Sequence, residues 1–167
     1  MTIGEFDRLN VEEKRKLLHQ CCGSTAWVNR MLSTPPAEDL IDLFEDAEEC
    51  WYSVTEEDWK EAFANHPRIG DLESIRKKFA GDKFAGGEQS SVQHASEQTL
   101  QALAEGNKAY EEKFGYIFIV SAEGKSAVEM LGLLTARLQN KQQTEITIAM
   151  DEQSKITRSR LEKLFNS

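Results

Sequence analysis

The distribution of proline and glycine is the sequence feature that most limits how this chain can fold. Only three prolines occur in 167 residues, Pro35, Pro36 and Pro67, and most of the glycines lie between Gly70 and Gly132. These two residue types are the strongest interruptions of regular structure, so long stretches remain free to form helices. The sequence therefore favours a helical chain.

Apolar side chains recur at helical intervals through most of the sequence. A clear example follows the break at residues 33–36, where the spaced apolar residues are Leu40, Leu43, Phe44, Ala47 and Trp51. Thr55 with Asp58, and Ser126 with Glu129, resemble capping boxes that start helices. We expect an all-α fold: a single domain over residues 1–167, built as a bundle of about seven or eight helices with short loops.

Residues 116–120, Tyr-Ile-Phe-Ile-Val, do not follow the helical pattern. Their β-branched and aromatic composition is typical of a strand, but little else nearby resembles one. The sequence leaves two alternatives open, a lone extended segment and the buried end of a helix.

Charge and composition exclude several classes of protein. The net charge of −9 argues against nucleic-acid binding, which needs a basic face. No apolar run approaches the length of a membrane span, and the N-terminus lacks a secretory signal pattern. The three cysteines form no disulfide framework, and neither a Cys-x-x-Cys nor a His-x-x-x-His pair is present for a metal. We expect a cytoplasmic protein without nucleic-acid or membrane partners.

His66 is the first candidate for chemistry. It falls where the helix that begins near Thr55 should end, because Pro67 disfavours a helical conformation of the residue before it. Carbonyl groups at the helix end favour the protonated ring and burial opposes it, so proton exchange near neutral pH is feasible in either case. The alternative is a helix cap that packs against the core.

Glu88 and Gln89 form the second candidate. They follow Gly86 and Gly87, which allow close approach of the backbone to a ligand. A carboxylate beside a carboxamide suits recognition of a polar heterocycle. The alternative is a solvated loop that leads into a helix with an acidic first turn.

Residues 121–126, Ser-Ala-Glu-Gly-Lys-Ser, form the third candidate because they precede the helix expected from Ser126. Free N–H groups at a helix start and the charge of Lys125 would suit an anion, although an ordinary helix start is the alternative. Arg160 lies among apolar residues, where a structural role is favoured. The cysteines also lie on apolar stripes and are expected to be inert.

These residues, in this order and spacing, resemble one family, the 2-oxo-4-hydroxy-4-carboxy-5-ureidoimidazoline (OHCU) decarboxylases of urate degradation. The likeness extends from about Phe6 to Phe165. The matching positions are His66-Pro67-x-Ile69-Gly70, Glu88-Gln89, Asn107-x-x-Tyr110-x-x-Lys113-Phe114-Gly115-x-x-Phe118-Ile119, Arg137-Leu138-x-Asn140, Glu145, and Lys155-Ile156-x-x-x-Arg160-Leu161.

The resemblance implies an all-α, usually dimeric protein that needs no metal or organic cofactor. By position it implies that His66 and Glu88 are catalytic. The substrate-contacting residues that it implies are Pro67, Gln89, Phe118, Ile119, Ser121 and Ala122. The expected activity is decarboxylation of OHCU to (S)-allantoin by a cytoplasmic homodimer.

The sequence departs from the family pattern at two positions. Ala85 stands where members often have a serine, and the turn around Gly124 lacks an arginine that many members have, so we assign its anion-binding role to Lys125. Glu97 and Gln98 are an alternative acid–amide pair, but they lengthen the gap from the histidine.

Two other functions remain open from the sequence. One is hydrolysis of a ureide or cyclic amide, which normally wants a metal or an activated nucleophile. The other is a helical ureide-binding or interaction module without catalysis, which the two departures would favour.

Overall fold

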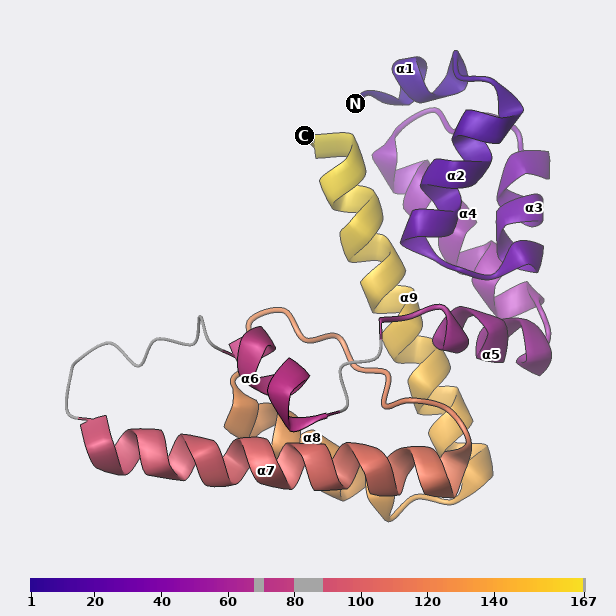
Figure 1. Cartoon of the computed structure of the whole chain (residues 1–167). Helices are drawn as coiled ribbons and strands as arrows, with labels where there is room; N and C mark the ends of the chain where they lie inside the picture. Colours follow the sequence, from indigo (N-terminus) through magenta and orange to yellow (C-terminus); the bar gives the residue numbers. More distant parts are fainter. Residues whose placement is uncertain (68–70, 80–88, 167) are drawn as a thin grey trace. The chain divides into compact units, whose positions relative to one another are not determined.

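The computed structural model describes residues 1–67, 71–79 and 89–166, and for 89–96 it describes the backbone alone. Nine helices and no strand occur in this part of the chain (Figure 1). The prediction of an all-α chain is confirmed. The helix beyond the seven or eight expected is α1 (Ile3–Asp7), whose five residues are too few to show an apolar period.

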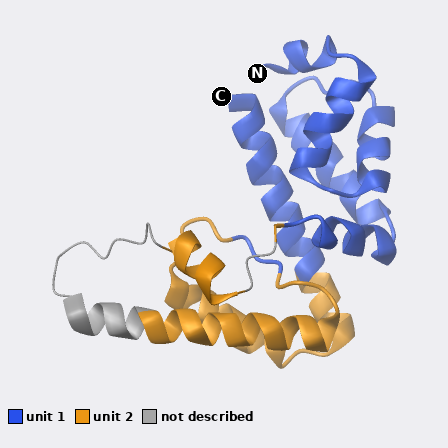
Figure 2. Cartoon of the chain, in the orientation of Figure 1, with its two compact units in different colours: residues 1–66, 119–121, 149–167 blue, residues 67–118, 122–148 orange. Residues whose placement is uncertain are grey.

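The chain divides into two compact units (Figure 2). Unit 1 comprises Met1–His66, Ile119–Ser121 and Ala149–Ser167. It holds α1, α2 (Val11–Cys21), α3 (Thr25–Ser33), α4 (Leu40–Ser53), α5 (Glu56–Ala64) and the later part of α9 (Gln142–Asn166).

Tryptophan side chains join the helices of unit 1. Trp27 and Trp51 are almost fully buried. The Trp27 indole N–H donates to the Ala47 carbonyl at 2.9 Å, joining α3 to α4, and the Trp51 indole N–H donates to the Met150 carbonyl at 2.9 Å, joining α4 to α9. These bonds satisfy the indole N–H groups inside an apolar core.

Local capping explains where these helices begin. The side chains of Asn10, Ser24, Asp39 and Thr55 each accept a hydrogen bond from a backbone N–H in the first turn of the helix that follows. Such caps satisfy N–H groups that have no partner within the helix. The capping box predicted at Thr55 and Asp58 is confirmed.

Unit 2 comprises Pro67–Phe118 and Ala122–Ile148, with α6 (Leu72–Phe79), α7 (Gln89–Phe114), α8 (Ala127–Leu138) and the first turns of α9. Helices α6 and α8 both pack against α7. A Cβ atom on Gly106 would lie 2.6 Å from Leu134 Cδ2, so glycine allows α7 and α8 to approach closely. The chain leaves α7 at Gly115, whose φ of +83° favours glycine.

Residues 117–122 form neither helix nor strand. Of the two alternatives that the sequence left open for residues 116–120, the buried end of a helix is wrong, because α7 ends before them. Among the helices of the described residues, none is both long enough and apolar enough to cross a membrane.

Candidate functional site

The end of α5 fixes the backbone position of His66. The helix ends at Ala64, and the His66 N–H donates to the Phe63 carbonyl at 3.3 Å. The Asn65 side chain donates to the Gly23 carbonyl at 2.7 Å. A Cβ atom on Gly23 would lie 2.6 Å from Asn65 Cβ, so this contact needs glycine. The helix end is therefore anchored immediately before the histidine, close to the predicted boundary.

The His66 ring is held by a short hydrogen-bond chain within unit 1. Its Nε2 atom bonds to Oε1 of Gln153, and the Gln153 carboxamide nitrogen donates to the Thr157 hydroxyl at 3.0 Å. The Gln153 side chain has no exposed surface, and Thr157 is also buried. All three residues lie on α9 or at the end of α5, so the ring is attached to the core of the unit.

Burial decides the protonation of this ring. Loss of solvation lowers the pKa of His66 below its ordinary value, and the positive charge of Arg160 lowers it further. The hydrogen bond to Gln153 acts in the opposite direction. Since the net effect is a lowered pKa, His66 is a neutral imidazole at neutral pH and carries a lone pair that accepts a proton.

Residues 119–121 of the expected substrate wall also belong to unit 1. Ile119 is buried, and the Ser121 N–H donates to Oε1 of Glu152 at 3.1 Å. The other carboxylate oxygen of Glu152 accepts from the Lys155 ammonium group at 2.6 Å. Glu152 therefore attaches the Ser121 backbone to α9, one residue before Gln153.

Phe118 belongs to unit 2, where cationic and aromatic groups surround its ring. The Arg137 guanidinium carbon lies 4.5 Å from the centre of this ring, and the Tyr110 ring centre lies 5.2 Å from it. A guanidinium over an aromatic face is attracted by the electron density of the ring. These contacts fix Phe118 at the point where the wall segment begins.

Arg137 itself is part of a buried ionic network. Its Nε and Nη2 atoms donate to Oε2 of Glu145 at 2.8 and 2.6 Å, and Asn140 donates to Oε1 at 3.1 Å. The Tyr110 hydroxyl donates to the same carboxylate. Burial, followed by this bond, raises the pKa of the Tyr110 hydroxyl. The family motif residues in α7, α8 and α9 thus come together as structural support for unit 2.

Lys125 precedes the N-terminus of α8 as the sequence predicted. The Ser126 hydroxyl accepts from the Glu129 N–H at 3.2 Å, and Gly124 adopts a φ of +72°, which favours glycine. Lys125 and Ala122 are half-buried. The anion-binding role of Lys125 stays a prediction.

The remaining expected site residues are Pro67, Glu88 and Gln89. Pro67 is exposed and belongs to unit 2. Gln89 is the first residue of α7, but its side chain lies outside the described residues, as does the whole of Glu88. The catalytic role that the resemblance implies for Glu88 therefore stays a prediction.

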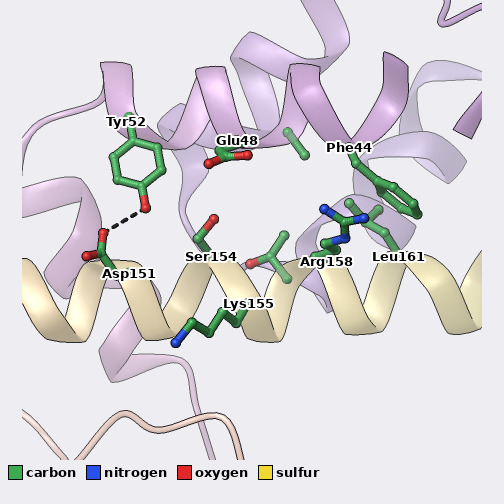
Figure 3. A pocket seen from close by; sticks show the side chains of 10 residues that line it. Phe44, Glu48, Tyr52, Asp151, Ser154, Lys155, Arg158 and Leu161 are labelled. Carbon is green, nitrogen blue, oxygen red and sulfur yellow. Dashed lines mark hydrogen bonds between the residues drawn. The ribbon is translucent and has the colours of Figure 1, made fainter. Parts of the chain in front are cut away.

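A hollow of about 380 Å³ lies between α4 and α9 in unit 1 (Figure 3). On one side of it the Tyr52 hydroxyl donates to Asp151 at 2.7 Å, and on the other the Arg158 guanidinium carbon lies 4.8 Å from the centre of the Phe44 ring. Thr157 lines this hollow as well, whereas His66 does not. Within the described residues, no three His, Cys, Asp or Glu side chains gather in a way that could hold a metal ion.

Comparison with known proteins identifies the family. The model of the family described as OHCU decarboxylase matches residues 7–162. This chain belongs to the OHCU decarboxylase family. A crystal structure of OHCU decarboxylase in the presence of (S)-allantoin is 36% identical, with a TM-score of 0.71, over 89% of this chain and 96% of that chain.

Curated relatives agree with this family assignment. The uric acid degradation bifunctional protein TTL of Arabidopsis thaliana is 39% identical over 87% of this chain. This chain spans only 45% of the length of that relative. The 2-oxo-4-hydroxy-4-carboxy-5-ureidoimidazoline decarboxylase of Haloferax volcanii is 21% identical, over 100% of this chain and 98% of that protein.

Sequence reasoning missed three residues that support the site in this OHCU decarboxylase family member: Glu152, Gln153 and Thr157. A signal was available, since α9 carries a buried stripe at helical spacing. Its members are Ile146, Ala149, Met150, Gln153, Thr157 and Leu161. Two polar residues inside an otherwise apolar stripe need hydrogen-bond partners, and here each partners the other.

Arg160 also does more than the sequence indicated. Its guanidinium donates to the Cys21 carbonyl at 3.2 Å, which is the structural role that we expected. Its positive charge also lowers the pKa of His66, in addition to the larger effect of burial. Arg160 therefore belongs to the electrostatic surroundings of the candidate site.

Proposed function

We propose that this protein decarboxylates OHCU to (S)-allantoin in urate degradation, without a metal or organic cofactor. The observation that carries the proposal is the match to the OHCU decarboxylase family over residues 7–162. The neutral His66 ring, held inside unit 1, supports it because the reaction needs a group that exchanges a proton near neutral pH.

The substrate supplies its own electron sink. Its carboxylate sits on a carbon that also bears a hydroxyl group and adjoins a ring C=N bond. When the bond to the carboxylate breaks, CO₂ leaves and the electron pair moves toward that C=N group, whose nitrogen takes up a proton. Loss of the hydroxyl proton then forms the new carbonyl group, and one proton is delivered to a single face of the neighbouring carbon.

The chain provides groups for each of these requirements. We assign the hydroxyl proton and the later proton transfer to His66. Glu88 and Gln89 would hold the ring and ureido N–H groups, and Lys125 would orient the carboxylate. The wall is assigned to Pro67, Phe118, Ile119, Ser121 and Ala122.

The test is turnover of freshly generated OHCU, followed by circular dichroism of the product. Positioned acid–base help is worth about 10²–10⁴-fold, so His66→Ala should lose at least about 10²-fold in kcat while the helical far-ultraviolet spectrum is retained. Near-normal formation of optically active allantoin by His66→Ala would rule out this role.

A second variant tests the carboxylate. Glu88→Gln keeps the size of the side chain but removes the negative charge. An unchanged rate and an unchanged product stereochemistry would remove Glu88 from the catalytic residues. A wild-type protein that binds OHCU without turnover would instead indicate the binding module, and turnover that depends on a metal found by emission spectroscopy would indicate the hydrolase.

We further propose that residues 1–167 act as one cytoplasmic domain that forms a homodimer, as the family resemblance implies. Light scattering coupled to size-exclusion chromatography measures the mass in solution directly. A monomeric mass at micromolar concentration would contradict the dimer. Unfolding in two separate transitions would contradict the single domain.

A further inference from the structure

The proton on the His66 ring is directed by a residue to which neither the family resemblance nor the comparisons assign a role. We infer that Gln153 is a positioning residue that holds His66 as the tautomer with its proton on Nε2, so that Nδ1 carries the lone pair. The kinetic part of this inference rests on the proposed function.

The orientation of the Gln153 carboxamide is the first step. Its nitrogen donates to the Thr157 hydroxyl at 3.0 Å, so its oxygen is the atom that faces the ring. A carboxamide oxygen only accepts hydrogen bonds. Nε2 of His66 must therefore be the donor, and a neutral imidazole with a proton on Nε2 has none on Nδ1.

Burial fixes this orientation of the Gln153 carboxamide. Gln153 has no exposed surface, and Thr157 is 5% exposed. If the carboxamide turned over, its nitrogen would face the ring and its oxygen would face Thr157, which would force the ring to accept on Nε2.

The tautomer matters because the His66 ring is neutral, and only a neutral imidazole has one nitrogen without a proton. Of the described charged residues, Arg160 acts on the ring, and its positive charge disfavours a second proton. A neutral ring with a fixed proton presents one defined basic nitrogen to a substrate. Without Gln153 the two tautomers would exchange, and a fraction of the molecules would present an N–H where a base is required.

The first experiment is nitrogen NMR of the ¹⁵N-labelled full chain, which contains three histidines, with the His66→Gln spectrum used to identify the His66 signals. We expect pyridine-type nitrogen at Nδ1, pyrrole-type nitrogen at Nε2, and a slowly exchanging Nε2 proton. A proton on Nδ1 of His66 in the wild-type chain would overturn the inference, whatever the activity.

Variants test the cause. Gln153→Leu keeps the volume but removes the acceptor, and it should shift the tautomer ratio toward Nδ1–H by about 2- to 10-fold, the equivalent of one neutral hydrogen bond. The matched control is Gln143→Leu, which alters an exposed glutamine of the same helix and should leave the ratio unchanged. An unchanged ratio in Gln153→Leu would contradict the role of Gln153.

Kinetics separate positioning from packing. Because Gln153 acts through His66, Gln153→Leu should lower kcat by no more than the tautomer shift, at most about 2- to 10-fold, with little change in KM. Gln153→Glu should raise the pKa of His66 and shift the pH dependence of kcat to higher pH. Replacing a residue with a purely structural role would not cause this shift. A wild-type chain with the expected tautomer but no turnover of OHCU would refute the proposed function and leave the tautomer assignment intact.

Discussion

Replacing Arg137 with methionine would test the buried ionic network of unit 2. The side chains of Arg137 and Glu145 are 7% and 0% exposed. The substitution keeps much of the apolar volume of Arg137 but removes both N–H groups that bond to Oε2 of Glu145 at 2.6 and 2.8 Å. The carboxylate keeps its bonds to Tyr110 and Asn140 but loses the opposite charge.

The magnitude follows from these contacts. Hydrogen bonds to a charged group contribute about 1.5–3 kcal/mol each, so two of them amount to about 3–6 kcal/mol. Breaking a buried pair by removing one partner costs about 3–5 kcal/mol, which agrees. Since a domain is stable by only about 5–15 kcal/mol, Arg137→Met should lose a large part of the free energy of unfolding.

The assay is equilibrium unfolding in urea, followed by circular dichroism and by tryptophan fluorescence. With an m value of about 2 kcal/mol/M, the midpoint should fall by about 1.5–2.5 M. The matched control is Lys60→Met, which breaks a 3.8 Å ion pair with Glu56 between half-exposed side chains and should cost less than about 1 kcal/mol.

A double variant tests whether the loss of stability comes from the unpaired buried charge of Glu145. Arg137→Met with Glu145→Leu removes the uncompensated charge, so it should be more stable than Arg137→Met alone. A loss below about 1 kcal/mol in Arg137→Met, or a double variant whose loss equals the sum of the two single losses, would show that the network contributes no buried ion pair to stability.

Three further outcomes are expected. Because the pKa of His66 is lowered on folding, its contribution to the free energy of unfolding is present above about pH 6.5 and is lost as the pH falls through the folded pKa. His66→Gln should make the free energy of unfolding, measured in urea between pH 5 and 8, less dependent on pH. Gly23→Ala forces Asn65 away and should cost about 1–3 kcal/mol in the same assay while lowering turnover. Burial raises the pKa of the Cys21 thiol to about 11 and of the Cys22 thiol to about 12, so iodoacetamide at pH 8 should modify both only after unfolding, as mass spectrometry would show.

Local signals in the sequence predicted most of the helical fold. The capping box at Thr55, the N-cap at Ser126 and the periodic apolar stripe of α4 each depend on residues within one or two turns, and the structure confirms them. At Ser126 the Glu129 carboxylate accepts from the Ser126 hydroxyl and does not complete the predicted capping box. The helix end before Pro67 depends on a steric effect between adjacent residues. Helix α1 escaped prediction because five residues do not contain enough turns for a period.

Tertiary partners could not be predicted in the same way. The family pattern names Tyr110, Arg137 and Glu145, but nothing in their spacing indicates that these side chains bond to one another across as many as 35 residues. Gln153 and His66 are 87 residues apart, and an amide in a helix has many possible partners. Only the folded chain shows which partner each buried polar group takes.

Two consecutive residues of α9 bond to segments that are remote from each other in sequence. Glu152 accepts from the backbone N–H of Ser121, and Gln153 bonds to the ring of His66. Successive residues of a helix are turned by about 100° around its axis, so the pair reaches in two directions from one point. A single-residue deletion within α9 just before this pair would rotate both attachments off their targets together. Insertions and deletions that preserve the fold should consequently occur in the loops and not within α9.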